Sequence, residues 1–194
     1  MAFWYNRAMI DAQFLPTITA NRLTLRALDE RDIPALFTIF SQAEVMRYWS
    51  SPPMRELADA EALLQDIGAG FQQKTLFQWG VALTSTHQVI GTCTLFHLDS
   101  KNRRAEIGYA LAREQWGKGI MQEALTALVD FAFNSLDLHR IEADVDPRNH
   151  KSLRLLERLG FIKEGLLRER WLVGGEVQDS MMLGLLRREW KSGQ

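Results

Sequence analysis

Cysteine and histidine are scarce in this sequence. Of its 194 residues, one is cysteine (Cys93) and four are histidine. A single cysteine excludes an internal disulfide, and four histidines without ligand spacing give no metal site. A long hydrophobic run is also missing: Arg7 and Asp11 interrupt the opening segment MAFWYNRAMIDAQFLPTI. We therefore expect neither a signal peptide nor a membrane span, and the reducing cytoplasm as the location.

Charge of one sign does not dominate either. Charged residues make up 24% of the chain and the net charge is -1, so the overall basic footprint of a nucleic-acid-binding protein is absent and any basic site must be local. An apolar share of 46% is enough for a sizeable core. No repeat or linker marks a boundary. We expect one domain over residues 1–194, with 1–20 as an N-terminal extension packed on it.

Hydrophobic periodicity predicts a mixed α/β fold. Strands are expected at 22–28, 77–84, 89–98, 104–112, 140–145, 161–173 and 176–186, and helices over 33–40, over 57–71, after residue 119 and from Asn149 to Gly160. The strands between 77 and 112 should form an antiparallel meander. The strand 104–112, the helix after it and the strand 140–145 should form a crossover, so these two strands are expected to be parallel.

The segment WGKG, residues 116–119, leads directly into a predicted helix. A P-loop would need glycine and a hydroxyl residue where Ala112 and Gly119 stand, and a dinucleotide-binding fingerprint would need glycine in place of Gln122. Neither ATP nor NAD is therefore indicated. Glycines at a helix N-terminus still leave backbone N–H groups free for an anion such as pyrophosphate. The alternative is a tight turn without a ligand.

The run AEIGYALAREQWGKGIMQEAL, followed by RIEADVDPRNHKSLRLLERLGFIKEG, resembles the acyl-CoA-binding half of the GNAT acetyltransferases. Within that superfamily it is most similar to the ribosomal-protein N-terminal acetyltransferase (RimJ/RimL-like) branch, over about residues 21–187. The resemblance implies a mostly antiparallel mixed sheet with a central parallel strand pair that splays apart, and helices on both faces. It also implies acetyl-CoA as the acyl donor, an amine as acceptor, and a homodimer.

The resemblance assigns cofactor-binding residues one by one. The family's pyrophosphate pattern, Q/R-x-x-G-x-G/A, falls on Trp116, Gly117, Lys118, Gly119, Ile120 and Met121. Met121 replaces a small residue, so its bulk could alter helix packing, but its backbone N–H remains available. Pantetheine is expected to pair with the main chain of Leu111 and Ala112 between the splayed strands. Lys118, Arg113 and Lys151 could neutralise the adenosine phosphates, or lie solvated on the surface.

Acetyl transfer to an amine needs a base, an oxyanion donor and a proton for the leaving thiolate. We favour Glu106 as the base, acting through water; the alternative is a salt-bridged strand carboxylate. Asp99, Asp144 and Asp146 are weaker candidates. The resemblance places the oxyanion at a main-chain N–H near Ala110 or Leu111.

The family's usual tyrosine acid is missing from the helix that follows residue 149. Ser152 is therefore expected to donate the proton to the thiolate or to position water, with Asn149 bonding pantetheine. The structural alternative makes Asn149 the helix N-cap, with Ser152 at its third position. Both roles are compatible.

The acceptor is expected to contact Tyr48 and Trp49, although an aromatic and proline-rich bend can also be mere packing. One carboxylate suits an α-amine better than a lysine, which favours a protein N-terminus and leaves small amines open. Two further alternatives are a non-catalytic acyl-CoA sensor and a protein-interaction module without CoA affinity.

Overall fold

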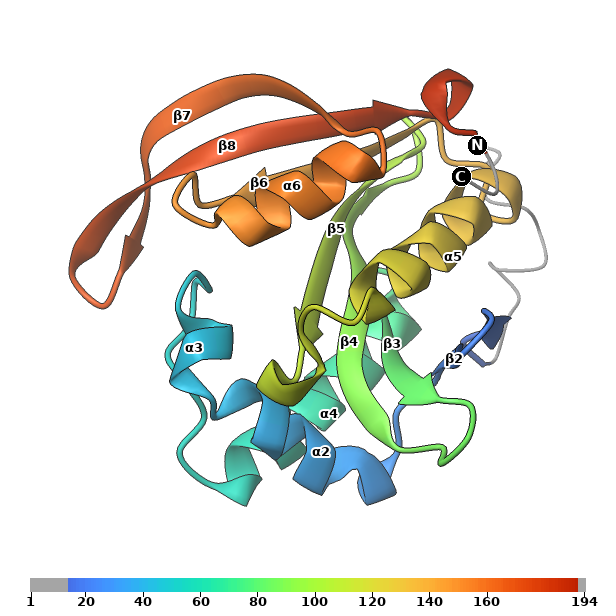
Figure 1. Ribbon diagram of the computed structural model, residues 1–194, viewed down its shortest axis with the longest axis vertical. Helices are drawn as coiled ribbons and strands as arrows, with labels where there is room; N and C mark the ends of the chain where they lie inside the picture. Colours follow the sequence, from blue (N-terminus) through green and yellow to red (C-terminus); the bar gives the residue numbers. More distant parts are fainter. Residues whose placement is uncertain (1–13, 192–194) are drawn as a thin grey trace.

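The fold is an eight-stranded sheet with helices on both faces, and it is seen in a computed structural model that describes residues 14–191 (Figure 1). The strand order is β1-β2-β3-β4-β5-β6-β8-β7. The strands are β1 (Ile18–Thr19), β2 (Leu23–Arg26), β3 (Leu76–Leu83), β4 (Val89–Asp99), β5 (Arg104–Leu111), β6 (Arg140–Val145), β7 (Ile162–Val173) and β8 (Glu176–Leu186). The helices are α2 (Ile33–Phe40), α3 (Ala43–Met46), α4 (Leu57–Gln73), α5 (Ile120–Asn134) and α6 (His150–Arg158), with short 3-10 turns at Glu30–Asp32, Arg113–Gln115 and Arg187–Glu189.

The predicted meander and crossover are both confirmed. Strands β3, β4 and β5 pair antiparallel in sequence order, and β5 pairs with β6 in parallel. That parallel pairing covers only residues 104–106 of β5 against 140–142 of β6. Beyond it, β5 stays with β4 as far as Leu111 and β6 stays with β8 as far as Val145. The two strands therefore separate, as the resemblance implies, and leave backbone edges open between them.

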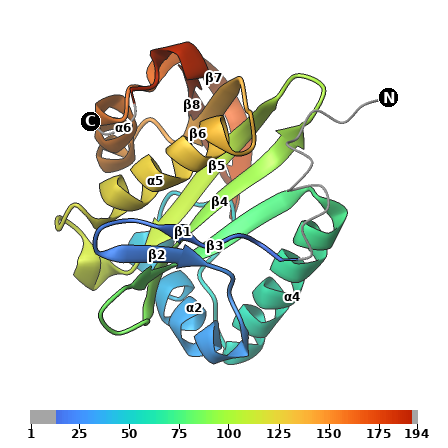
Figure 2. The ribbon, with the colours of Figure 1, turned by 90° about the vertical axis from the view of Figure 1, so that its right-hand side faces the viewer.

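Two apolar clusters cover opposite faces of the sheet. Figure 2 shows α5 on one side of the strands and α2 and α4 on the other. The first cluster joins α5 and α6 to the strands. Apolar side chains at helical spacing along α5 and just after it are buried in this cluster: Leu125, Leu128, Val129, Ala132, Phe133 and Leu136. Burying a leucine or phenylalanine contributes about 1.5–3 kcal/mol, so this stripe anchors the helix that starts at the glycine loop. The second cluster joins α2, α3 and α4 to the other face.

Some expectations differ from the structure. Hydrophobic spacing over 57–71 predicts a buried face that begins at Leu57, and this is wrong at its start, because Leu57 is 49% exposed. The aromatic and proline-rich bend that holds Tyr48 and Trp49 is preceded by the short helix α3, which was not expected. The edge order was not predicted either: β8 lies between β6 and β7, so β7 forms the edge. Within the described part of the chain, no helix has the length and apolarity to cross a membrane.

The predicted N-terminal extension is described only from residue 14, and its first part, 1–13, lies outside the described residues. The described part packs on the domain. Trp79 Nε1 donates a hydrogen bond of 2.8 Å to the carbonyl oxygen of Pro16, and Ile18 pairs with Leu25 to add β1 to the sheet.

Candidate active site

The glycine loop before α5 has the backbone that an anion site needs. Gly117 and Gly119 have φ of +77° and +73°, a region that L-residues other than glycine rarely adopt. Gly119 is the N-cap of α5, and no side chain caps the helix. The N–H groups of the first turn, including those of Ile120 and Met121, therefore point out of the helix without a side-chain acceptor. Such an N-terminus attracts anions through its free N–H groups and the helix dipole.

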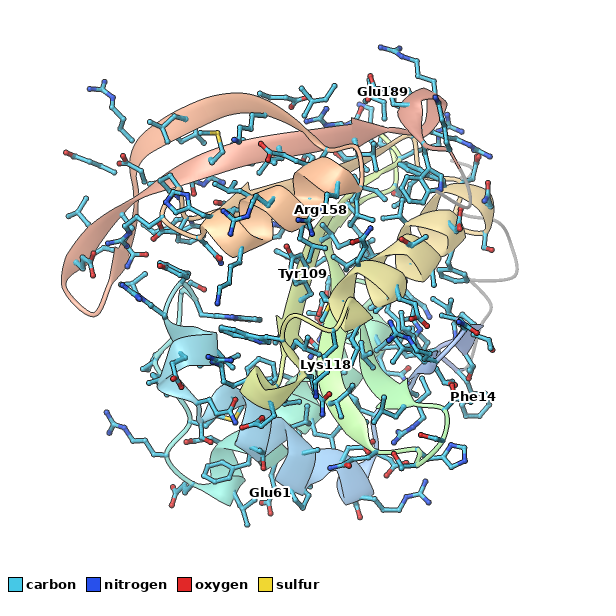
Figure 3. All side chains as sticks on the ribbon, viewed as in Figure 1. Phe14, Glu61, Tyr109, Lys118, Arg158 and Glu189 are labelled. Carbon is cyan, nitrogen blue, oxygen red and sulfur yellow. The ribbon has the colours of Figure 1, made fainter. Side chains whose placement is uncertain are left out.

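A cavity of about 690 Å³ adjoins this loop. It is bounded by the end of β5, the 116–119 loop, the start of α5, helix α6 and the segment around α3. Figure 3 labels two of its lining residues, Tyr109 on β5 and Arg158 on α6. The predicted residues that line it are Tyr48, Trp49, Leu111, Trp116, Gly117, Gly119, Ile120, Met121, Asn149 and Ser152. The fold therefore brings most of the predicted cofactor and acceptor residues to one cavity.

The cavity wall is strongly positive. Its cationic side chains are Arg47, Arg113, Lys151, Arg154 and Arg158, together with Arg148, which is paired with Asp146 and Glu176, and the one carboxylate among the lining residues is Glu44. The guanidinium of Arg113 and the ammonium of Lys151 lie 4.8 and 4.6 Å from the ring centre of Trp116. Because the whole chain has a net charge of -1, this is a local concentration of cations suited to a polyanion. Lys118 is not among the lining residues; its Nζ bonds Gln115 Oε1 at 3.0 Å.

On the splayed edge of β5, Leu111 has a backbone N–H available to pair with pantetheine, but Ala112 has no free backbone group. The Ala112 N–H donates to the carbonyl of Ile90 at 2.9 Å, and the Ala112 carbonyl accepts from the Gln115 N–H at 2.9 Å. The pantetheine-pairing role predicted for Ala112 therefore does not fit, because both of its backbone groups are used. Backbone groups alternate in direction along an antiparallel strand, so the Leu111 N–H points away from β4 into the slot. By the same alternation the Ala110 N–H points toward β4, which leaves Leu111 as the oxyanion candidate. The Leu111 carbonyl accepts from Trp116 Nε1 at 2.8 Å.

At the start of α6, Asn149 has the structural role of a helix N-cap. Its Oδ1 accepts a hydrogen bond of 3.2 Å from the Ser152 N–H, so Asn149 is the N-cap and Ser152 is the third helical residue. This contact occupies the side-chain oxygen and leaves the amide NH₂ group to donate elsewhere. Both residues line the cavity, and their contact with a cofactor stays a prediction.

The sequence reasoning missed Tyr109. Its hydroxyl lies 2.6 Å from Ser152 Oγ, and burial raises the pKa of the phenol, so Tyr109 is a neutral hydroxyl at the wall of the cavity. A tyrosine acid is expected in the helix that follows residue 149, whereas Tyr109 lies on strand β5. Strand alternation gave the missing signal, because it places Tyr109 on the face opposite Glu106, and this is the face that α6 covers.

Glu106 lies on the other face of the sheet, at the last residue of the β5–β6 pairing. It is not a lining residue of the cavity, so its predicted direction into the slot is not borne out; it lies beside the point where the strands separate. Its side chain is largely buried, and burial raises its pKa, although the contact between its carboxylate and His97 Nδ1 opposes the effect. A carboxylate with a raised pKa is a better proton acceptor.

The alternative carboxylates each have fixed partners. Asp99 accepts hydrogen bonds from Asn102, which lower its pKa. Burial would raise the pKa of Asp146, but hydrogen bonds from Arg148 outweigh it and the pKa is lowered. Asp144 accepts hydrogen bonds from Ser180, Trp171 and Arg170. Glu106 thus remains the candidate base.

Tyr48 and Trp49 lie beside the cavity by virtue of packing. Trp49 contacts Phe40 edge to face, with ring centres 5.4 Å apart, and the Arg47 guanidinium lies 5.3 Å from the Tyr48 ring centre. The packing interpretation therefore applies to Trp49. An acceptor role for either residue stays a prediction.

The bulk of Met121 is accommodated inside the core. Its sulfur lies 3.7 Å from the Cys93 sulfur, and both residues are buried. Burial raises the pKa of Cys93 well above its usual range. The thiol is therefore protonated and inaccessible, which leaves no support for a cysteine-linked acyl intermediate.

Comparison with known proteins gives one consistent family. A family model described as the acetyltransferase (GNAT) domain matches residues 22–162. The chain is 39% identical over 176 residues to the uncharacterized N-acetyltransferase p20 of Bacillus licheniformis, covering 91% of this chain and 99% of that protein. It is 28% identical to the [ribosomal protein uS5]-alanine N-acetyltransferase of Escherichia coli, over 91% of this chain and 94% of that one.

The crystal structure of spermidine N-acetyltransferase from Vibrio cholerae in complex with CoA and spermine has the same fold. Its TM-score is 0.77 at 27% identity, over 87% of this chain and 97% of that one. The family match, the splayed strand pair and the cationic cavity beside an uncapped helix agree with one another. The chain therefore belongs to the GNAT family of acetyltransferases, enzymes that transfer an acetyl group from acetyl-CoA to an amine.

Proposed function

We propose that this enzyme acetylates the α-amine of a protein N-terminus by direct attack in a ternary complex. The observation that carries the proposal is the position of two proton-handling groups. Glu106 lies on one face of the sheet, and the Tyr109–Ser152 pair lies on the other, on either side of the point where β5 and β6 separate. An amine arriving from the Glu106 side would meet a thioester held from the Ser152 side.

The residues around the cavity fit coenzyme A. The N–H groups of the 117–121 segment would hold the pyrophosphate, and Arg113, Lys151 and neighbouring arginines would neutralise the adenosine phosphates. Trp116 would fix the Leu111 carbonyl, which leaves the Leu111 N–H to donate into the slot. Bound acetyl-CoA supplies the thioester carbonyl that the amine attacks.

Each proton-handling residue then has one task. Glu106 accepts a proton from the attacking amine, directly or through water. The Leu111 N–H donates a hydrogen bond to the carbonyl oxygen as negative charge develops on it. Ser152, bonded to the neutral Tyr109 hydroxyl, donates a proton to the departing sulfur. Cys93 takes no part, because it is buried and protonated.

The α-amine is favoured by the cost of deprotonation. An α-amine with a pKa near ~8 costs about 1.4 kcal/mol to deprotonate at pH 7, whereas a lysine near ~10.4 costs about 4.6 kcal/mol. A single carboxylate supplies the smaller amount more readily. The likeness to a ribosomal-protein alanine N-acetyltransferase supports the same acceptor class. We further propose that the enzyme acts in the cytoplasm and forms a homodimer.

A small polyamine is the second candidate acceptor, because a spermidine N-acetyltransferase has the same fold. Release of free thiol from acetyl-CoA distinguishes the candidates when unblocked peptides, N-terminally blocked peptides containing lysine, and spermidine are offered separately. The proposal predicts release with unblocked peptides only. Faster release with spermidine would favour the polyamine, and CoA binding without release under any condition would favour a sensor.

A further inference from the structure

A β-bulge in β4 brings His97 beside Glu106. Phe96 is paired with Glu106 across the strands, so regular alternation would send the next side chain, His97, to the opposite face. The register shifts between Phe96 and Asp99, and His97 has a φ of +49°. This conformation is uncommon for a residue other than glycine. Bulges often redirect a side chain next to an active site, and here the imidazole is turned onto the face that carries Glu106.

The two side chains form a path from the protein interior to solvent. His97 Nδ1 lies 3.0 Å from Glu106 Oε2, within hydrogen-bond distance. The Glu106 side chain is 14% exposed and the His97 side chain is 70% exposed. The ring of Phe96 lies against the imidazole, with ring centres 4.7 Å apart, and limits its orientation. The carboxylate is therefore shielded from water while its histidine partner is open to it.

Acetylation of an ammonium group releases a net proton. The ammonium carries three N–H bonds and the amide product keeps one, so two protons leave the nitrogen. The departing sulfur takes one of them, and the other must reach solvent. On the proposed assignments, the Ser152 side of the sheet handles the first and the Glu106 side handles the second. A shielded carboxylate that has accepted a proton needs an outlet before the next turnover.

We propose that His97 is this outlet: a positioning residue that takes the proton from Glu106 and passes it to water. The inference rests on the proposed function, and specifically on Glu106 as the base. In the transfer, an amine N–H bond breaks as a Glu106 O–H bond forms. That O–H bond then breaks as Nδ1 of His97 gains the proton, and Nε2 of the imidazolium releases its own proton to water. Glu106 is then a carboxylate again, and the imidazole, left with its proton on Nδ1, regains the Nε2–H tautomer by proton exchange with water, to which its side chain is 70% exposed.

The other charged groups around Glu106 form ion pairs with one another. Asp144 of β6 and Arg170 of β7 form an ion pair at 3.0 Å. Arg104, two residues before Glu106, pairs with Glu142 of β6 at 2.7 Å. Arginine does not release its proton at neutral pH. The imidazole differs from these groups because its two ring nitrogens let it take up a proton at one atom and release one from the other.

His97→Gly tests the outlet in the full-length enzyme, because glycine accepts the positive φ of this position and leaves space for added imidazole. We expect the variant to keep the wild-type KM for acetyl-CoA and to lose about tenfold in kcat. Added imidazole should restore kcat in a concentration-dependent manner. His87→Gly is the matched control, since His87 is also exposed and has a φ of +59°, in the β3–β4 turn. It should change neither kcat nor the response to imidazole.

His97→Asn separates proton transfer from a purely structural hydrogen bond. Asparagine tolerates positive φ and can bond Glu106, but it cannot carry the proton. The proposal predicts that it is as slow as His97→Gly. Wild-type kcat in His97→Gly, or recovery of kcat in His97→Asn without imidazole, would overturn the proton outlet. The proposed function still holds after such an outcome if the wild type acetylates its acceptor and Glu106→Gln is slow; only the role of His97 is then lost. If Glu106→Gln keeps the wild-type rate, both assignments fail.

Discussion

The hydroxyl oxygens of Tyr109 and Ser152 lie 2.6 Å apart and join strand β5 to helix α6 at the wall of the cavity. One hydroxyl comes from a strand and the other from the first turn of a helix. Burial keeps the phenol neutral, so the pair can donate one proton toward the cavity and retain one bond between its members.

Ser152→Ala should slow acetyl transfer more than Tyr109→Phe. The serine change removes the proposed donor to the departing sulfur, and a positioned proton donor contributes about 10²–10⁴ in rate. The phenylalanine change removes only its hydrogen-bonding partner, and we expect a loss of about tenfold. Single-turnover thiol release at saturating acetyl-CoA measures both rates. Equal rates in the two variants and the wild type would remove this pair from the chemistry.

Gly117→Ala should weaken CoA binding through the backbone alone. A Cβ at Gly117 would meet no atom within 4 Å, but φ is +77°, and holding an L-residue in that region costs about 1–2 kcal/mol. If the cofactor requires this loop shape, the dissociation constant should rise by about 5- to 30-fold. Isothermal titration with CoA measures it.

Gly68→Ala serves as the control for the loop, because it too has open space around the new Cβ and lies within α4. Alanine is favoured over glycine in a helix, so this variant should be at least as stable as the wild type and bind CoA equally well. Unchanged CoA affinity in Gly117→Ala would mean that the 116–119 segment is a turn without a ligand.

Lys151→Ala should raise the KM for acetyl-CoA by about three- to tenfold, in line with a partly exposed charge-assisted contact. Its ammonium lies at the cavity over Trp116. The difference from wild type should shrink as salt is added, because screening weakens a contact between exposed charges. Lys101→Ala, an exposed lysine of the β4–β5 turn, should leave the KM unchanged. The prediction fails if both lysines behave alike.

Glu106→Gln should stabilise the fold at neutral pH while it slows the reaction. Burial raises the pKa of Glu106 in the folded state, so its ionised form costs stability above that pKa and the cost disappears below the unfolded pKa. The variant should therefore melt at a higher temperature than the wild type near pH 7, with a smaller difference near pH 4. Thermal unfolding at both values measures this, and the same gain at both pH values would contradict a buried, ionising Glu106.

Strand and helix positions followed closely from the sequence, because alternation and helical spacing are local signals. The splayed pair was expected from the resemblance, and its extent became visible only in the pairing of residues 104–106 with 140–142. Three features could not be predicted from the sequence, because they depend on contacts between residues on different elements. The Ala112 N–H donates a hydrogen bond to the carbonyl of Ile90, which is distant in sequence, so it cannot pair with the cofactor. Tyr109 meets Ser152 across 43 positions. His97 reaches Glu106 through a bulge, which breaks the alternation that sequence reasoning relies on.

The most direct measurement is the site of acetylation on a peptide that carries one free α-amine and one lysine. The peptide is incubated with the enzyme and acetyl-CoA, and fragment-ion mass spectrometry locates the acetyl group. The account predicts acetylation at the α-amine, lost in Glu106→Gln and slowed in Ser152→Ala. Acetylation at the lysine alone, or the same rate in both variants as in the wild type, would contradict it.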